Sequence, residues 1–323
     1  MIFCMGKKFI IAVAAVLAVG CGGRQTSRQT GAIEVQPFPQ VQVPSMIEDR
    51  DEAVEYAALH YFDKFADSER KGLCDSVTVA SVAAGEVEQA VSSWCFLLDK
   101  LPLQTARKAA SRLFHRAEAC EIADTSSNVF ESIVALVDRY LYDPNSPVRN
   151  EDIYQAFVQE KSLSSLFTDE QRQGFAETVR RCGLNQVGTR AADFLFSDRN
   201  GRTGHLYGVK AETTILFFSN PGCNACKEII DALKSRPEME DMIKSGDLAV
   251  VNVYIDEDLG EWYGYMGEYP LSWHNVYDPN LVIRNDLLYD VRAIPSLYLL
   301  NRDKIVLLKD TTTEKLLASV FGN

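Results

Sequence analysis

One segment joins an apolar run to a cysteine pair and an amphipathic stretch, and it constrains the fold more than any other. Residues 213–218 read Thr-Thr-Ile-Leu-Phe-Phe, a β-branched and aromatic run typical of a buried strand. The turn residues Pro221 and Gly222 follow, and then come Cys223 and Cys226. From Cys226 onwards the apolar residues recur with helical spacing. The segment therefore predicts a strand, a turn and a helix, with the cysteine pair where the helix begins.

This placement predicts that the two sulfurs differ. Unpaired backbone N–H groups and the helix dipole at a helix start favour a thiolate at Cys223. Cys226 belongs to the apolar stripe that faces the sheet, so we expect it to be shielded. An exposed nucleophile with a shielded resolving thiol is what thiol–disulfide exchange requires. A structural disulfide is the alternative. A zinc site needs two more ligands, and the sequence has no second Cys-x-x-Cys to supply them.

The rest of residues 185–323 continues the alternation of strands and helices. Short apolar runs are separated by turn residues and by stretches with helical period. This pattern predicts an α/β domain with a mixed central sheet flanked by helices. The predicted strands are residues 193–197, 204–207, 213–218, 248–255, 296–300 and 304–308.

Residues 47–184 have a different periodicity. Apolar residues recur there at helical spacing, without strand-like alternation. We predict an all-α domain over this range, placed before the α/β domain. The clearest apolar stripes are Val87, Ala90, Val91, Trp94, Cys95 and Leu98, and Phe130, Ile133, Val134, Val137, Tyr140 and Leu141.

The N-terminus has the pattern of an export signal. Lys7 and Lys8 precede an apolar run over residues 9–19, which is too short to span a bilayer. Small residues then lead to Cys21, and this pattern resembles the lipobox of bacterial lipoproteins, in which the cysteine carries the lipid. Ordinary cleavage before Cys21 fits the same residues. Both interpretations predict a signal peptide over residues 1–20, and lipidation would anchor the chain to a membrane of the cell envelope.

Residues 21–46 are polar, carry three prolines and have no helical period, so we predict a flexible tether. The chain has 33 Lys and Arg against 45 Asp and Glu, a net charge of −12. This charge argues against a nucleic-acid partner, which needs a basic face. Export would place the folded part in the periplasm or at the cell surface, where disulfides persist.

Three segments of the C-terminal half carry a resemblance to a known family. They read Gly-Thr-Arg-Ala-Ala-Asp-Phe at 188–194, Leu-Phe-Phe-Ser-Asn-Pro-Gly-Cys-Asn-Ala-Cys-Lys at 216–227, and Val-Arg-Ala-Ile-Pro-Ser-Leu-Tyr-Leu at 291–299. They resemble the thioredoxin-like superfamily, and within it the exported TlpA/ResA-type thiol–disulfide oxidoreductases. Through residues 142–150, the helical half resembles an N-terminal domain of unknown function found in some bacterial lipoproteins.

The resemblance implies a thioredoxin-like fold for residues 185–323 and roles for individual side chains. Cys223 and Cys226 match the catalytic pair, whose redox-active disulfide needs no further cofactor. Pro295 matches a cis-proline that faces the pair, and the backbone of Ile294 would pair with the substrate chain. The substrate-binding positions implied in this way are Pro221, Gly222, Ile294 and Pro295.

The sequence also departs from that family. Gly222 stands where the family usually has Trp, and Phe217 stands where thioredoxin has a buried Asp. Glu228 is one residue short of the position of a buried Glu in ResA-type proteins. Proton transfer to the second cysteine therefore has no assigned helper. Ile294 before Pro295 is what thioredoxin-like reductants carry, which favours reduction over oxidation.

Four further cysteines lie in the helical half. In an exported domain they could form structural disulfides, and the alternative is that they are buried thiols packing as small hydrophobes. The four histidines are scattered along the chain, and we expect no metal site. The candidate structural cysteines are Cys74, Cys95, Cys120 and Cys182.

The sequence as a whole favours an exported thiol–disulfide oxidoreductase, with reduction as the favoured direction. Its expected partners are protein thiols and disulfides, together with an electron-exchange partner that the sequence does not identify. A surface binding module with a structural or vestigial cysteine pair is the first alternative. A thiol peroxidase is the second, although its reactive cysteine follows Thr or Ser at three residues' distance, where this chain has Asn220.

Overall fold

The computed structural model describes residues 35–322. The predicted signal peptide, the lipidation site Cys21 and the first part of the predicted tether lie outside the described residues. Within residues 35–322, no helix combines the length and the apolar character needed to cross a bilayer.

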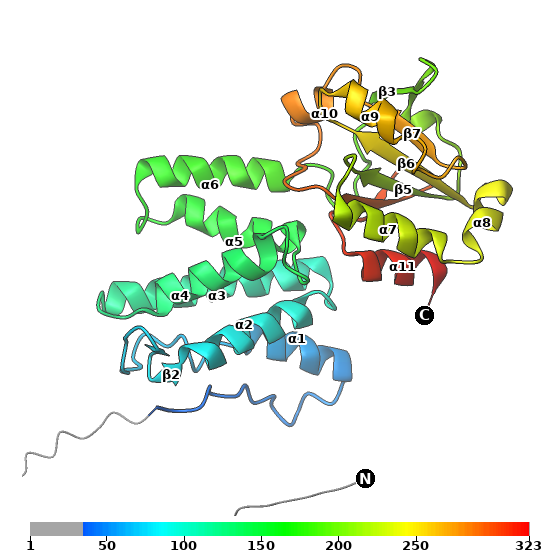
Figure 1. Cartoon of the computed structure of the whole chain (residues 1–323). Coiled ribbons are helices and arrows are strands. Elements are labelled where there is room, and N and C mark those ends of the chain that lie inside the picture. Colours follow the sequence, from blue (N-terminus) through cyan, green and yellow to red (C-terminus); the bar gives the residue numbers. More distant parts are fainter. Residues whose placement is uncertain (1–34, 323) are drawn as a thin grey trace, which may run out of the picture. The chain divides into compact units, whose positions relative to one another are not determined.

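The N-terminal half is built mainly from helices (Figure 1). Helix α3 is the longest and packs against α1, α4 and α5, and α6 packs against α5. A five-residue π-helical segment, Asp138–Tyr142, continues α4. The helices are α1 (Arg50–His60), α2 (Ala84–Leu98), α3 (Leu103–Ala123), α4 (Val129–Val137), α5 (Glu151–Leu163) and α6 (Asp169–Cys182).

This half is not purely helical, which corrects the prediction of an all-α domain. Strands β1 (Thr78–Val79) and β2 (Val82–Ala83) form a short antiparallel hairpin in front of α2. Ala80 and Ser81 make its two-residue turn, and both have positive φ, 46° and 65°. Two-residue hairpins favour this backbone conformation because its twist matches that of the strands, although glycine or asparagine adopts it more easily. Because neither turn residue is glycine or asparagine, the sequence pattern did not predict this hairpin.

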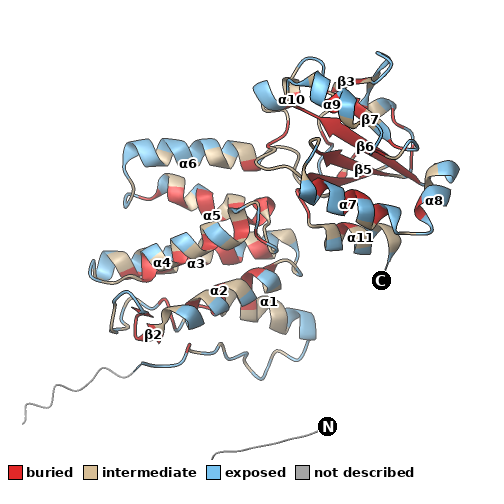
Figure 2. Ribbon diagram, in the orientation of Figure 1, coloured by how far each residue is buried: buried red, intermediate tan, exposed pale blue. Residues whose placement is uncertain are grey.

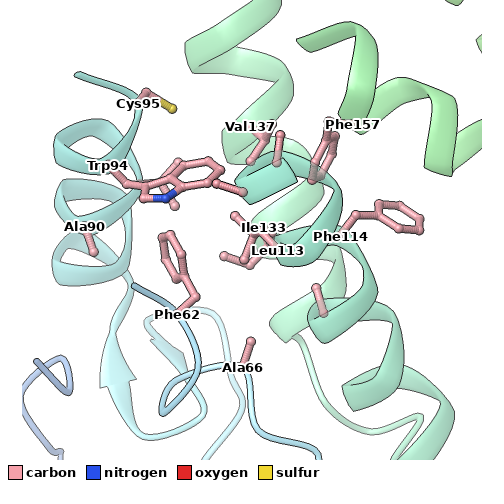
Figure 3. Close-up of a cluster of buried hydrophobic side chains, with 14 of the residues drawn as sticks. Phe62, Ala66, Ala90, Trp94, Cys95, Leu113, Phe114, Ile133, Val137 and Phe157 are labelled. Carbon is pink, nitrogen blue, oxygen red and sulfur yellow. The ribbon is translucent and has the colours of Figure 1, made fainter. Parts of the chain in front are cut away.

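The predicted apolar stripes make the core of the helical half. Trp94 is fully buried, and its Nε1–H donates to the backbone oxygen of Ala58 at 2.9 Å. The ring of Phe62 meets that of Trp94 edge-on with centroids 5.4 Å apart, and Figure 3 shows the Phe62 ring pointing toward the Trp94 indole. Such edge-on pairs add to the free energy gained from burial alone.

The end of the predicted tether belongs to this core, which corrects its boundary. Phe38 is only 8% exposed and packs against the rings of Phe62 and Phe65. The Phe38 N–H donates to Glu86 Oε2 at 2.9 Å, and the Gln36 N–H donates to the oxygen of Ser81 at 2.7 Å. Residues 36–38 are therefore part of the fold rather than of a flexible segment.

The C-terminal half contains a mixed sheet, as predicted. In the described part of the chain it has seven strands in the order β4-β3-β7-β6-β5-β8-β9. Strands β5, β6 and β7 are parallel, and the remaining neighbours are antiparallel. The sequence pattern did not predict β7. The strands are β3 (Leu195–Asp198), β4 (Thr203–His205), β5 (Thr213–Phe218), β6 (Leu248–Tyr254), β7 (His274–Tyr277), β8 (Ser296–Asn301) and β9 (Val306–Leu308).

Helices and loops cover both faces of this sheet, so its central strands are buried. Figure 2 shows β5 and β6 buried along their length and α7 exposed on one side only. Alternate residues of β5 face opposite ways: Phe217 packs in the same cluster as α7 and α11, and Phe218 packs in the cluster that includes α10. The helices are α7 (Asn224–Lys234), α8 (Met239–Ser245), α9 (Leu259–Tyr265), α10 (Val282–Asn285) and α11 (Thr313–Phe321).

Candidate active site

Cys223 is the N-cap residue of α7. Strand β5 ends at Phe218, and the chain turns through Gly222, whose φ of +68° lies in the left-handed region that glycine adopts freely. The Cys226 N–H, which has no partner within the helix, donates to Cys223 Sγ at 3.1 Å. Together with the helix dipole, this contact stabilises negative charge on Cys223 Sγ.

Cys226 lies one helical turn further and is shielded. It is 2% exposed, whereas Cys223 is only partly buried. Its neighbours in the buried cluster include Phe217 of β5 and Ile229 of α7. The two cysteines form a disulfide with Cα atoms 5.2 Å apart. As predicted, Cys223 is the more exposed of the two cysteines, although it is partly buried rather than fully exposed.

The loop before β8 lies at the same edge of the sheet as the cysteine pair. Phe218, the last residue of β5, is the antiparallel partner of Ser296, the first residue of β8. The Ile294–Pro295 peptide bond immediately before β8 is cis, as the family resemblance implied. A cavity of about 490 Å³ borders both elements, and Ala225, Ile294 and Pro295 line it. The structure thus brings together the residues around Cys223 and the loop at Pro295.

Polar side chains that the sequence analysis missed hold the turn between β5 and α7. The Asn220 amide donates to Asp256 Oδ2 at 2.6 Å, and Asp256 pairs with Arg284 at 2.7 Å. The buried Ser219 hydroxyl donates to Asn252 Oδ1 at 2.5 Å. A single polar residue inside the apolar run of β6 was the available signal for Asn252.

The structure leaves both candidate carboxylate positions unsuited to assist the shielded thiol. Phe217 is fully buried at the position of thioredoxin's acid, and an aromatic ring carries no exchangeable proton. Glu228 is exposed on α7, on a different side of the helix from the buried Cys226. Neither of these two positions therefore supplies a proton-transfer helper to Cys226.

Of the two alternatives left open for the cysteines of the helical half, the structure shows free thiols. Within residues 35–322, Cys74, Cys95, Cys120 and Cys182 form no disulfide. Cys95, Cys120 and Cys182 are buried members of the apolar core and pack as small hydrophobes, whereas Cys74 is partly exposed in a loop. Burial raises the pKa of the Cys182 thiol to about 12, because the apolar surroundings disfavour a thiolate.

Comparison with solved structures identifies the fold family. A thioredoxin-like protein from Bacteroides caccae ATCC 43185 is 33% identical to this chain, with a TM-score of 0.75, and the match covers 88% of this chain and 98% of that one. The chain belongs to the thioredoxin-like family. The family described as a domain of unknown function (DUF5106) matches residues 20–180, which contain most of the helical half.

Two further structures each match 42% of this chain. The C-terminal domain of an uncharacterized protein from Bacteroides fragilis NCTC 9343 is 44% identical, with 42% of this chain and 97% of that chain covered and a TM-score of 0.41. A conserved protein of unknown function from Bacteroides fragilis is 34% identical, with 42% and 98% covered and a TM-score of 0.41. No curated protein matches the chain.

Proposed function

We propose that the thioredoxin-like half is an enzyme that exchanges thiols and disulfides with client proteins through Cys223 and Cys226, and that it works as a reductase. The observation that carries the proposal is the asymmetry of the pair. Cys223 is partly exposed and its Sγ accepts the Cys226 N–H at 3.1 Å, whereas Cys226 is 2% exposed. Thiol–disulfide exchange needs one sulfur that attacks and a second that resolves the mixed disulfide.

The reaction begins with the pair reduced. The Cys223 thiolate attacks one sulfur of a client disulfide, the client S–S bond breaks, and the second client sulfur leaves as a thiolate that takes up a proton. Cys226 then loses its proton and attacks Cys223 Sγ in the mixed disulfide. The client leaves with both sulfurs as thiols, and the Cys223–Cys226 disulfide forms. Two electrons pass from the pair to the client, and an external thiol donor returns them.

The surroundings of the pair support these steps. The start of α7 lowers the free energy of the attacking thiolate through the Cys226 N–H and the helix dipole. Pro295 and the backbone of Ile294 lie at the same sheet edge, where they would hold an extended client chain. Pro221 and Gly222 lie in the turn immediately before Cys223, where they would also contact the client chain. No cofactor beyond the dithiol enters these steps.

An insulin-reduction assay tests the proposal. We expect the wild-type protein, supplied with a small dithiol, to reduce insulin disulfides, and Cys223→Ser to lose this turnover. Cys226→Ser should keep the attack and accumulate a mixed disulfide that mass spectrometry detects. Equal, negligible turnover by wild type and Cys223→Ser would leave a binding module with a structural disulfide. Peroxide consumption that requires Cys223, without insulin reduction, would indicate a peroxidase.

The direction of transfer is tested by the reduction potential of the Cys223–Cys226 couple. A value near about −270 mV, as in thioredoxin, supports a reductase, and a value near about −120 mV, as in DsbA, indicates an oxidant. Equilibration against glutathione or dithiothreitol buffers, followed by thiol alkylation, measures it.

We further propose that residues 1–20 direct export and that Cys21 carries a lipid, so that the mainly helical half and the thioredoxin-like half (185–323) work at a membrane of the cell envelope. Metabolic labelling with palmitate tests the anchor. We expect label in the wild-type protein and none in Cys21→Ser, whereas unlabelled wild-type protein released in soluble form would indicate ordinary signal cleavage.

A further inference from the structure

The cavity beside the cysteine pair has walls from both halves of the protein. Its volume of about 490 Å³ is that of a ligand-sized pocket. Ile229 of α7, Ile294 and Leu297 give it an apolar surface on the thioredoxin-like side. On the other side it is lined by Pro144 and Asn145 of the segment between the π-helical turn and α5. The helical half therefore contributes directly to the surface that borders Pro295.

Hydrogen bonds hold the helical wall in place. The Ser146 hydroxyl donates to the Tyr140 oxygen at 2.6 Å, which closes the loop on itself. Arg149 crosses to the other half, where its Nε donates to Asp310 Oδ2 at 3.2 Å and its Nη2 donates to the Thr311 oxygen at 2.9 Å. Asp310 in turn accepts from the Ser296 hydroxyl, next to Pro295. The wall and the cis-proline loop are thus tied to the same carboxylate.

The uncompensated charge in the lining is negative. Arg149 lines the cavity but is paired with Asp310. Glu228 of α7 and Glu314 of α11 also line it, both are exposed, and neither has an ion-pair or hydrogen-bond partner among residues 35–322. An apolar surface with free carboxylates fits a side chain that has a long aliphatic stem and a cationic end. Lysine and arginine have that form.

We propose that this groove selects client chains in which a lysine or arginine lies next to the cysteine under attack. The inference rests on the proposed function, because it names the clients of that same site. The client's cysteine meets Cys223, its backbone runs along Ile294 and Pro295, and the neighbouring basic side chain lies in the groove. There its stem packs on Ile229, and its cation approaches Glu228 and Glu314.

The test uses two synthetic peptides that differ only in having lysine or glutamine beside a single cysteine. Each cysteine is joined to 5-thio-2-nitrobenzoate, so attack by Cys223 breaks that disulfide, releases the coloured thiolate and leaves the peptide on the enzyme until Cys226 frees it. We expect the reduced wild-type protein to react about three- to tenfold faster with the lysine peptide, because two exposed ion pairs together contribute a free energy of that size. The preference should shrink at high salt.

Two double variants change the net charge by the same amount. Comparing them distinguishes the local effect of the groove carboxylates from the effect of the protein's overall negative charge on a cationic peptide. Glu228→Gln with Glu314→Gln should bring the ratio of the two peptide rates close to one. Glu48→Gln with Glu170→Gln alters exposed carboxylates of the helical half that do not line the cavity and should keep the wild-type ratio. A third variant, Asn145→Trp, fills the groove from the helical side and should slow both peptides more than it slows reduction of Ellman's reagent, which has no peptide side chain to place there.

The outcomes distinguish the two proposals. Wild-type protein that reduces Ellman's reagent and insulin but reacts equally with both peptides overturns the inference and leaves the proposed function standing. The inference also fails if both double variants lose the preference equally, or if Asn145→Trp changes neither peptide rate. Wild-type protein that reduces neither insulin nor Ellman's reagent overturns the proposed function itself.

Discussion

At the scale of single residues, the reactivity proposed for the two cysteines depends on their positions in the first turn of α7. Cys223 is both the N-cap of α7 and the proposed nucleophile, and Cys226 is shielded because helical spacing turns it toward the sheet. These features follow from sequence position alone, so the sequence predicted them. Asn252 and Asp256 were missed because their partners, Ser219 and Asn220, lie 33 and 36 residues away in the chain.

The contrast between accessible and buried thiols predicts different rates of alkylation. Burial raises the pKa of Cys182 to about 12, so at pH 8 only about one thiol in 10⁴ is ionised. We expect Cys182 to resist iodoacetamide in the native reduced protein, with a rate that rises about tenfold per pH unit, while Cys223 reacts first. Mass spectrometry of timed samples measures this. Rapid native labelling of Cys182 at pH 8 would contradict its burial.

The backbone at Gly222 predicts a stability change that involves no lost contact. Its φ is +68°, and a methyl group there would meet nothing within 4 Å, so Gly222→Ala tests the conformation alone. We expect a loss of about 1–2 kcal/mol in the free energy of unfolding. Gly264→Ala is the control, because Gly264 lies in α9 with equally open space and should be neutral or stabilising. Urea denaturation that ranks both variants equally would refute the explanation.

At the scale of elements, periodicity predicted what is locally encoded. The stripes at Val87–Leu98 and Phe130–Leu141 are core faces, and the runs at residues 213–218 and 248–255 lie in central strands. Strand β7 was missed because only Val276 of its four residues is buried, and its place is set by parallel pairing with β6. Residues 36–38 were assigned to the tether because no local period marks a segment that is ordered by distant rings.

Because residues 36–38 pack against the core, we predict that removing the Phe38 ring destabilises the helical half. Phe38 contacts the rings of Phe62 and Phe65 with centroids 5.7 and 5.1 Å away. We expect Phe38→Ala to lower the free energy of unfolding by about 3 kcal/mol, because it leaves a cavity in the core. Val43→Ala, at a side chain that lies five residues further along the chain and is 38% exposed, is the control and should change stability little. A Phe38→Ala variant as stable as this control would show that residues 36–38 do not support the core.

At the scale of the whole molecule, the two halves are joined by buried charges. Glu151, at the start of α5, accepts from Arg292 Nε at 2.6 Å and pairs with Lys309 at 3.0 Å. Arg292 also lies 4.1 Å from the centre of the Tyr142 ring and precedes Pro295 by three residues. The sequence could not predict this network, because Glu151 and Arg292 are 141 positions apart.

Removing one member of this network should cost more than removing an exposed ion pair. We expect Glu151→Ala to lower the free energy of unfolding by about 3–5 kcal/mol, since Arg292 and Lys309 would stay buried without this partner. Glu212→Ala breaks the exposed pair with Arg302 and should cost less than about 1 kcal/mol. Denaturant titration followed by tryptophan fluorescence measures both. Similar losses in the two variants would mean that water reaches the network and screens it.

The cap at Cys223 links the chemistry of the pair to the melting behaviour of the fold. The atom that accepts the Cys226 N–H is a thiolate in the attacking form and a neutral disulfide sulfur in the resting form, so the first turn of α7 is anchored differently in each. By a closed thermodynamic cycle, the difference in folding free energy between the two redox forms equals the difference between the reduction free energies of the folded and unfolded chains. Calorimetry on the oxidised and reduced protein, without any client present, therefore measures how much folding changes the reduction free energy of the Cys223–Cys226 disulfide.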